Sequence, residues 1–258
     1  MNLPLLLSFT RQDLIDRYSG SILGGAWSFI MPLVNMLIFI LVFSRIMGAR
    51  LEALGQEFSE YSYSIYLVTG MLAWNAFANT VQRATNIYRE KAGLIGKVKI
   101  SLISLPFFIL LTESVIYLIS LIFFAIFLVL IDFPVDQYWL LIPVVFVIQQ
   151  LFAYALGFMM AILNVFVHDT RELVTVIVQL WFWLTPIVYV TNILPDSVQK
   201  LFGFNPMYIL VQAYRDLILY HRGPSLDGLF WVLMLGLIIL GLALFLFKKL
   251  ERDIRDFI

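Results

Sequence analysis

The stretch LPFFILLTESVIYLISLIFFAIFLVLI, residues 105–131, decides the fold class, because Glu113 is the one charged residue in an otherwise apolar run. A bilayer core of about 30 Å is crossed by about 20 residues of helix at a rise of about 1.5 Å per residue. The run is long enough, and its apolar residues do not alternate with polar ones as they would in a strand of a membrane barrel. It therefore predicts a transmembrane helix.

The rest of the chain shares this composition. Its 258 residues are 62% hydrophobic and 13% charged, and the mean hydropathy is +0.93. A soluble domain carries about 25% charged residues, and a soluble particle of this size could not cover so much apolar surface. The composition excludes a soluble enzyme and a disordered chain, and the absence of cysteine excludes a disulfide scaffold. The net charge of zero gives no reason to expect a nucleic-acid partner.

Long runs with few charges recur along the chain and set the expected architecture. We expect one all-α membrane domain, residues 1–258, with six transmembrane helices at about residues 25–46, 62–82, 105–131, 139–167, 173–190 and 228–247. An even number of spans places both termini on one side of the membrane.

The basic residues orient these spans, because they accumulate in cytoplasmic loops. Twelve of the 17 fall on the side of the termini: Arg11, Arg17, Arg83, Arg89, Lys91, Lys97, Lys99, Arg171, Lys248, Lys249, Arg252 and Arg255. The other five are Arg45, Arg50, Lys200, Arg215 and Arg222. Both termini are therefore expected in the cytoplasm.

The segment before the first span, residues 1–20, is expected to form an amphipathic helix at the membrane interface. Leucines and Ile15 fall near one face, while Arg11, Asp13 and Arg17 fall mostly on the other. It lacks the basic region that begins a signal peptide, and charges follow its apolar run at once. The alternative is a frayed cytoplasmic tail.

Residues 83–104 form the longest basic cytoplasmic segment. Its charge is explained by the positive-inside rule alone, but the apolar pair Leu94-Ile95 between Gly93 and Gly96 is not. A short helix that presents this pair to a cytoplasmic partner is the second interpretation. The sequence at residues 93–97, GLIGK, fails the spacing of a phosphate-binding loop. We therefore expect no nucleotide or other cofactor on this chain, so that energy comes from another polypeptide or an ion gradient.

The external segment 191–227 is long, rich in apolar residues and interrupted by prolines. Structureless loops of such length are uncommon. We expect two short re-entrant or interfacial helices with a hinge at Asn205-Pro206, which places Arg215 and Asp216 at the external water boundary.

Few ionisable residues offer chemistry inside the spans. Glu113 has two possible roles, a structural hydrogen bond or a proton or substrate function. His168 and His221 have no partner at metal-ligand spacing, and no catalytic pair points to an intramembrane enzyme. The small residues Ala153, Gly157 and Ala161 recur on one face of the fourth span and predict close helix packing.

Aromatic residues gather at Trp74 and Phe77 and again at Trp181, Trp183 and Tyr189. One interpretation is the aromatic belt of a membrane protein. The other is a route for sugars, because aromatic faces suit the apolar faces of sugar rings and the Tyr hydroxyl and Trp N–H groups can bind sugar hydroxyls.

Several motifs together resemble a known family. They are RYSGSILGGAW at residues 17–27 followed by Pro32, YLVTG at 66–70 with Trp74 and Phe77, NVFVHDTRE at 164–172, WLTPIVY at 183–189, NPM at 205–207 and KKLERDI at 248–254. In this order they are similar to the ABC-2-type permeases of polysaccharide ABC exporters. The O-antigen and lipopolysaccharide exporters are the most similar subgroup, with capsule and teichoic-acid permeases as relatives. The chain departs from the family pattern at His168, where Arg is usual.

The resemblance implies a homodimer in the bacterial inner membrane with two ABC ATPase subunits that hold ATP and Mg. The cargo would be a polysaccharide on undecaprenyl diphosphate, moved from the cytoplasm to the periplasm. The implied roles are ATPase coupling by Glu90, Lys91, Leu94, Ile95 and Lys97, sugar contact by Trp74, Phe77, Trp181, Trp183 and Tyr189, and a re-entrant gate with Asn205, Pro206 and Arg215. Arg11 and Arg17 would attract the lipid diphosphate, and the alternative is that they anchor the helix to phospholipid. An ion-coupled or passive transporter of small solutes is the alternative function.

Overall fold

The computed structural model describes residues 3–17, 20–42, 61–95, 101–191, 195, 199 and 201–257, and these contain helices and no strand. The elements are α1 Leu3–Asp16, η1 Gly24–Ala26, α2 Trp27–Val42, α4 Ser62–Glu90, α5 Ala92–Ile95, α6 Ser104–Leu130, η3 Gln137–Leu141, α7 Ile142–Phe166, α8 Thr170–Trp183, α10 Pro206–Ile218 and α11 Leu226–Phe257. The prediction of an all-α protein is confirmed.

Four helical stretches in the described part of the chain are long and apolar enough to cross a membrane: Gly24–Val42, Ser104–Leu130, Gln137–Phe166 and Leu226–Phe257. They coincide with four of the expected spans, and the multi-pass character is confirmed. The count of six is not. α4 has 29 residues but carries many polar side chains, and α8 has 14 residues, a length of only about 21 Å.

α8 is short because of its sequence. The expected span at 173–190 continues beyond Trp183, but the helix ends there and Leu184 closes it. Pro186 follows two residues later, and proline has no backbone N–H to continue the helical ladder. The stretch 185–189 is therefore non-helical, and its carbonyl groups need donors from elsewhere.

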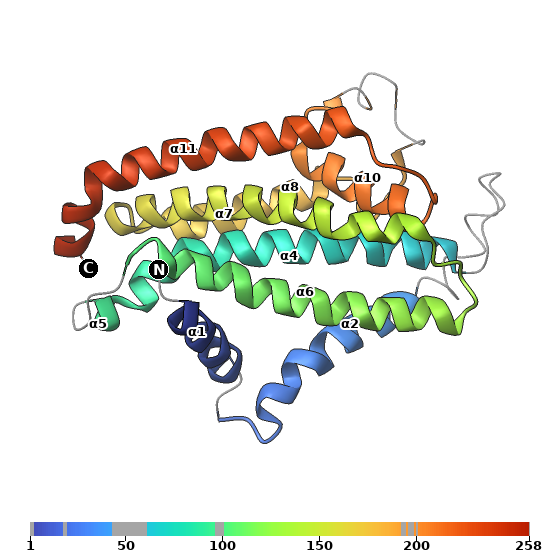
Figure 1. Cartoon of the computed structure of the whole chain (residues 1–258), viewed down its shortest axis with the longest axis horizontal. Coiled ribbons are helices and arrows are strands. Elements are labelled where there is room, and N and C mark those ends of the chain that lie inside the picture. Colours follow the sequence, from blue (N-terminus) through green and yellow to red (C-terminus); the bar gives the residue numbers. More distant parts are fainter. Residues whose placement is uncertain are drawn as a thin grey trace.

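α4 is the central helix, with α6 and α7 on either side of it and α11 beyond α7 (Figure 1). Small residues let these helices approach one another closely, as the stripe on the fourth span predicts. A Cβ atom at Gly157 would come within 2.7 Å of the Cβ atom of Ala84 on α4. A Cβ atom at Gly236 of α11 would come within 2.8 Å of Leu151 on α7.

The buried apolar side chains form two clusters along this bundle. The first surrounds Phe77, Phe152 and Tyr214, and the second surrounds Tyr88, Phe108 and Phe158. α1 joins the second cluster through Leu6, which is buried, and through Phe9, whose ring centroid lies 5.6 Å from that of Phe108. The expected N-terminal helix is thus present and packs against the bundle.

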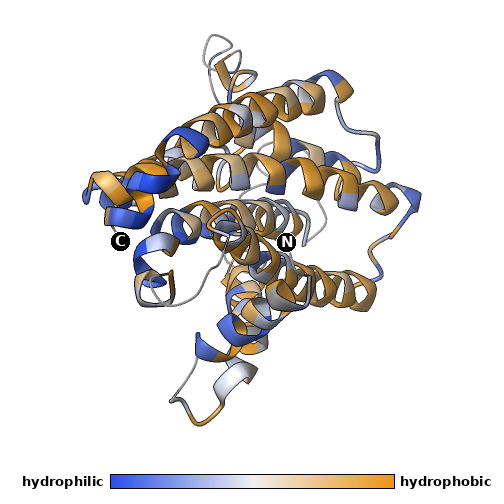
Figure 2. Cartoon of the chain, turned by 60° about the vertical axis from the view of Figure 1, so that its left-hand side comes forward, coloured by the Kyte–Doolittle hydropathy of each residue, from blue (hydrophilic) through white to orange (hydrophobic). Residues whose placement is uncertain are grey.

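The two ends of the bundle differ. Both termini lie at the end where α5 is found, and α10 lies toward the opposite end (Figure 1). Most of the helical surface is hydrophobic, and hydrophilic residues gather mainly at helix ends (Figure 2). Large apolar side chains such as Leu118 and Phe245 are exposed along the helices, as a lipid environment requires.

Candidate functional site

A cluster of four charged side chains joins three helices near the end of the bundle that holds the termini. Arg83 of α4 donates to Asp13 of α1, from NH2 to Oδ1 at 2.6 Å and to Oδ2 at 2.8 Å. NH1 of Arg83 donates to Oε1 of Glu113 on α6 at 2.7 Å. Arg17 donates to the same Glu113 oxygen. The cluster contains two cations and two carboxylates, so its charges cancel.

The charged side chains of this cluster are largely removed from solvent. The side chain of Glu113 is 1% exposed and that of Arg83 is 25% exposed. A carboxylate inside a membrane helix is costly unless it is paired, and here two guanidinium groups pair it. These contacts agree with a structural role for Glu113 rather than with a proton or substrate function. Arg83 and Asp13 were missed by the sequence analysis, because they lie 30 and 100 residues from Glu113 in the chain.

The two arginines expected to attract a lipid diphosphate lie in different settings. Arg17 faces inward to Glu113 and its side chain is 22% exposed. Arg11 is exposed on α1. The structure therefore does not bring them together in one site.

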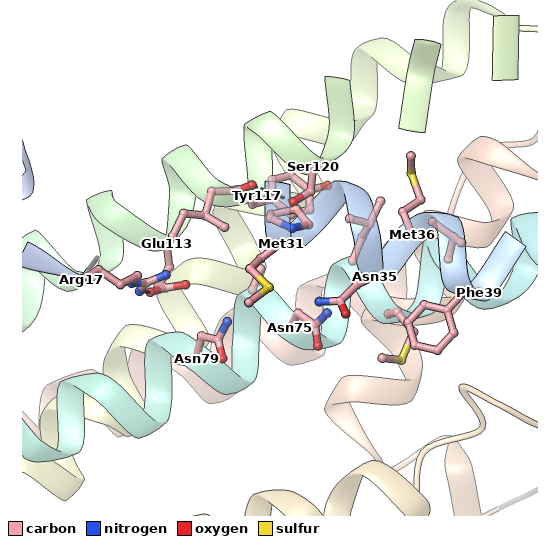
Figure 3. A pocket seen from close by; sticks show the side chains of 16 residues that line it. Arg17, Met31, Asn35, Met36, Phe39, Asn75, Asn79, Glu113, Tyr117 and Ser120 are labelled. Carbon is pink, nitrogen blue, oxygen red and sulfur yellow. Dashed lines mark hydrogen bonds and ion pairs between the residues drawn. The ribbon is translucent and has the colours of Figure 1, made fainter. Parts of the chain in front are cut away.

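A pocket of about 200 Å³ lies beside the charge cluster, between α2, α4 and α6 (Figure 3). Arg17 and Glu113 form one end of it. Amide side chains line its length, Asn35 from α2 and Asn75 and Asn79 from α4. The pocket thus combines these amides with apolar side chains such as Met31 and Met71. This pocket was not among the sites expected from the sequence.

Most of the aromatic residues expected to contact sugar pack against one another inside the chain. Trp74 is 5% exposed and Phe77 is 0% exposed. The ring centroid of Trp181 lies 5.3 Å from that of Phe77 and 6.5 Å from that of Trp74. The expectation that Trp74 and Phe77 are open to a ligand is therefore corrected, because both side chains are buried in the first core cluster. Trp183 is 60% exposed.

Asn205 connects the end of α8 to the start of α10. Its Oδ1 atom accepts from the Met207 backbone N–H at 3.0 Å, which caps α10, and Pro206 occupies the first turn, where no N–H is needed. The same oxygen accepts from Nε1 of Trp181 at 2.9 Å, and Nδ2 donates to the Thr185 hydroxyl at 3.1 Å. The predicted hinge thus contacts the predicted aromatic site directly.

The non-helical stretch after α8 is held by side chains from α4 and α10. Arg215 donates to the carbonyl of Pro186 at 2.8 Å and to that of Ile187 at 3.0 Å. The Tyr63 hydroxyl donates to the Val188 carbonyl, and the Tyr66 hydroxyl donates to the Tyr189 carbonyl at 3.0 Å. Four consecutive carbonyl groups, 186 to 189, therefore receive side-chain donors. We call this arrangement the carbonyl clamp.

Arg215 is the centre of the carbonyl clamp, and its position corrects an expectation. The residue is 0% exposed, not at the external water boundary. Its guanidinium carbon lies 3.4 Å from the ring centroid of Tyr66, a cation–π contact. Space for it exists because Gly70 lacks a side chain: a Cβ atom there would come within 3.0 Å of the Arg215 NH2 atom. The neighbouring Asp216 pairs with Arg222 at 2.7 Å.

The expected coupling segment is helical at its centre, where α5 covers Ala92–Ile95. Glu90 and Gly93 are exposed and Lys91 is half-buried. Ile95 is 7% exposed and belongs to the second core cluster. The expectation that Ile95 is presented to a partner is therefore corrected, because it faces the chain's own core. Lys97 and the side chain of Leu94 lie outside the described residues.

The remaining titratable residues form no further cluster of this kind. In the described ranges no group of three or more His, Asp and Glu side chains could hold a metal ion. His168 is exposed in the turn between α7 and α8. Nδ1 of His221 lies 2.9 Å from Oδ2 of Asp136, which ties the loop after α10 to the loop before η3.

The chain is similar to proteins of known class along nearly its whole length. The pattern of the ABC-2 type transporter family matches residues 4–219. The O-antigen export system permease protein RfbA of Myxococcus xanthus is 27% identical over 258 residues, which cover 98% of this chain and 94% of that protein. A Klebsiella pneumoniae protein of the same name is 24% identical over 248 residues, covering 96% and 92%. Since the family pattern covers well over half of the chain, this multi-pass membrane protein belongs to the ABC-2 type transporter family.

Proposed function

We propose that the chain is the permease subunit of an ATP-driven exporter that moves an O-antigen-type polysaccharide, linked to undecaprenyl diphosphate, from the cytoplasm to the periplasm. The observation that carries the proposal is the similarity to O-antigen export permeases over nearly the full length of both chains. Membership of the family implies ABC ATPase partner subunits. Two copies of this chain and two ATPase subunits, which hold ATP and Mg, would form the exporter in the bacterial inner membrane.

The arrangement in the membrane follows from this proposal. α4, and α8 together with the non-helical stretch 185–189 that follows it, would cross the bilayer with the four apolar helices, which gives six spans and cytoplasmic termini. α10 is the second helix of a re-entrant pair at the periplasmic side, and the segment expected to hold the first helix lies partly outside the described residues. The location of α10 at the end of the bundle opposite the termini supports this assignment (Figure 1).

The charge cluster argues against the alternative of a proton-coupled transporter of small solutes. A proton or solute path through the membrane needs polar groups that are free to exchange partners. Glu113 is instead engaged in ion pairs with both Arg17 and Arg83, and its side chain is 1% exposed. The cluster instead fixes the amphipathic helix α1 against α4 and α6.

The surface that contacts the ATPase is proposed to be the α4–α5 corner, where Glu90 and Lys91 lie. Reversing both charges, Glu90→Lys with Lys91→Glu, should lower the amount of ATPase that co-purifies with the permease at least fivefold. Glu90 is exposed, and the hydrogen bond that it loses, from Asn86 at 2.8 Å, lies at the surface, so the chain itself should stay folded. The measurement is pull-down of the tagged permease from detergent extract, with ATP hydrolysis assayed in the eluate.

The matched control is Asp227→Lys, an exposed reversal at the start of α11, which lies far from the α4–α5 corner. We expect it to retain the ATPase. Equal ATPase recovery from the Glu90/Lys91 variant and the control would remove the coupling role of this corner. Hydrolysis of ATP by the purified permease without its partner would overturn the proposal that the partner subunits hydrolyse the ATP.

A further inference from the structure

The central helix α4 has an unusual surface. Its side chains from Ser62 to Arg89 are buried or half-buried, except for Asn75 and Asn79, which are exposed. These two positions are four residues apart and therefore lie one above the other on the same face of the helix. Between Ser62 and Arg89, the open part of this largely enclosed central helix is thus formed by two carboxamides.

A third carboxamide completes the arrangement. Asn35 of α2 is exposed and lines the same pocket, with its amide next to that of Asn75 (Figure 3). Among the described residues no hydrogen bond joins any of the three amides to another group. Each amide offers two donors and an acceptor, and these groups face the open pocket. The pocket can therefore exchange water for a ligand that is rich in both donors and acceptors.

The electrostatics of the pocket indicate a neutral ligand. The charged side chains in its lining are Arg17 and Glu113, and these are paired with each other. Arg83 and Asp13 behind them are paired as well. An anionic or cationic ligand would meet no uncompensated opposite charge here.

The apolar part of the lining suits a ring with one apolar face. Met31 and Met71 line the pocket together with the aromatic ring of Tyr117. Methionine side chains are flexible and polarizable, so they adapt to ligands of varied shape. Amides for hydroxyl groups and adaptable apolar groups for ring faces are what a sugar requires.

We propose that this pocket, the amide groove, is a subsite for uncharged sugar residues of the exported polymer, bound through Asn35, Asn75 and Asn79. The inference rests on the proposed export function. About 200 Å³ holds a small part of a polymer at a time. Neutral amides suit a moving chain, because transport needs contacts that are favourable on entry and weak enough to release.

The absence of cysteine in the natural chain makes a direct test possible. Single cysteines replace Asn75 or Asn79 in the full exporter, and open membranes are treated with a charged methanethiosulfonate reagent. The membranes come from cells that make the polymer or from cells lacking the first sugar transferase. We expect labelling at least fivefold slower where polymer is present. Leu118→Cys, on the exposed apolar face of α6, should label equally slowly in both.

The outcomes of this experiment distinguish a failure of the sugar subsite from a failure of the proposed export function. Equal labelling of the Asn75 and Asn79 cysteines in both membranes, while the same cells export polymer, overturns the sugar subsite and leaves the exporter proposal intact. Failure to label either cysteine overturns it too, because the groove would then be closed to water. Absence of export in cells with the unaltered chain contradicts the proposed function itself.

A second pair of variants tests function without relying on labelling. Asn75→Leu with Asn79→Leu is expected to reduce surface polymer at least tenfold at equal permease level, since leucine offers no hydrogen bonds. Asn75→Gln with Asn79→Gln, which keeps the amides, should restore at least half of the export. Full export by the leucine variant would overturn the proposal.

Discussion

Arg83→Met is expected to lower the free energy of unfolding of the chain by about 3–5 kcal/mol, the usual cost of removing one partner of a buried ion pair. Arg83 contacts Asp13 and Glu113 at once, with distances of 2.6 Å and 2.7 Å. Without it, the buried carboxylate of Glu113 retains only Arg17, and Asp13 loses the contact that holds α1 to α4. Export should fall in parallel, because α1 would lose its ion-pair contact with α4.

The measurement is unfolding of the detergent-solubilised protein in increasing SDS, followed by tryptophan fluorescence. Arg171→Met is the matched control, because Arg171 and Glu172 are exposed and 3.8 Å apart; such pairs contribute about 0–1 kcal/mol. Adding Glu113→Gln to Arg83→Met should recover part of the loss, with a coupling energy of about 0.5–3 kcal/mol. Equal stability of the Arg83 and Arg171 variants would show that the charge cluster does not stabilise the fold.

Arg215→Met is expected to loosen the non-helical stretch after α8 and to reduce export at least tenfold. The substitution leaves the carbonyl groups of Pro186 and Ile187 without the guanidinium donor. Each buried acceptor that loses its partner costs about 1–3 kcal/mol. A cost of about 1.4 kcal/mol already corresponds to a tenfold change in the local opening equilibrium. Hydrogen exchange of the peptide that contains Thr185 and Ile187 should therefore become at least ten times faster.

Arg222→Met serves as the comparison for the carbonyl clamp. The Arg222 side chain is 63% exposed and pairs with Asp216, so its removal should change exchange in this peptide less than twofold. Tyr66→Phe removes the hydroxyl that reaches the Tyr189 carbonyl and should give an intermediate increase. Unchanged exchange in the Arg215 variant would show that the carbonyl clamp does not hold this stretch.

Features that are local in the sequence could be predicted. The apolar run at residues 105–131 corresponds to α6, Ser104–Leu130, because burial of backbone groups in lipid permits little besides a helix. The hinge at Asn205-Pro206 coincides with the start of α10, since both residue types favour that position. The small residues around Gly157 do lie at the contact between α7 and α4.

Features that depend on distant partners could not be predicted. Nothing in the sequence around Glu113 shows that Arg83 and Asp13 reach it. Arg215 was expected at the external water boundary because of the re-entrant helices predicted around Asn205-Pro206. It is instead buried against a carbonyl stretch that exists only because α8 ends early. The spacing of Asn75 and Asn79 was a visible signal, but which face of α4 stays open depends on how α2 and α6 pack against it.

The most direct test of the export function is the location of the polysaccharide in cells that lack this chain. The polymer should be synthesised but remain cytoplasmic, where an antibody to it binds only after the cells are permeabilised. Restoring the chain together with its ATPase should return the polymer to the cell surface. Normal surface polymer in cells without the chain would contradict the proposal that it is the permease of a polysaccharide exporter.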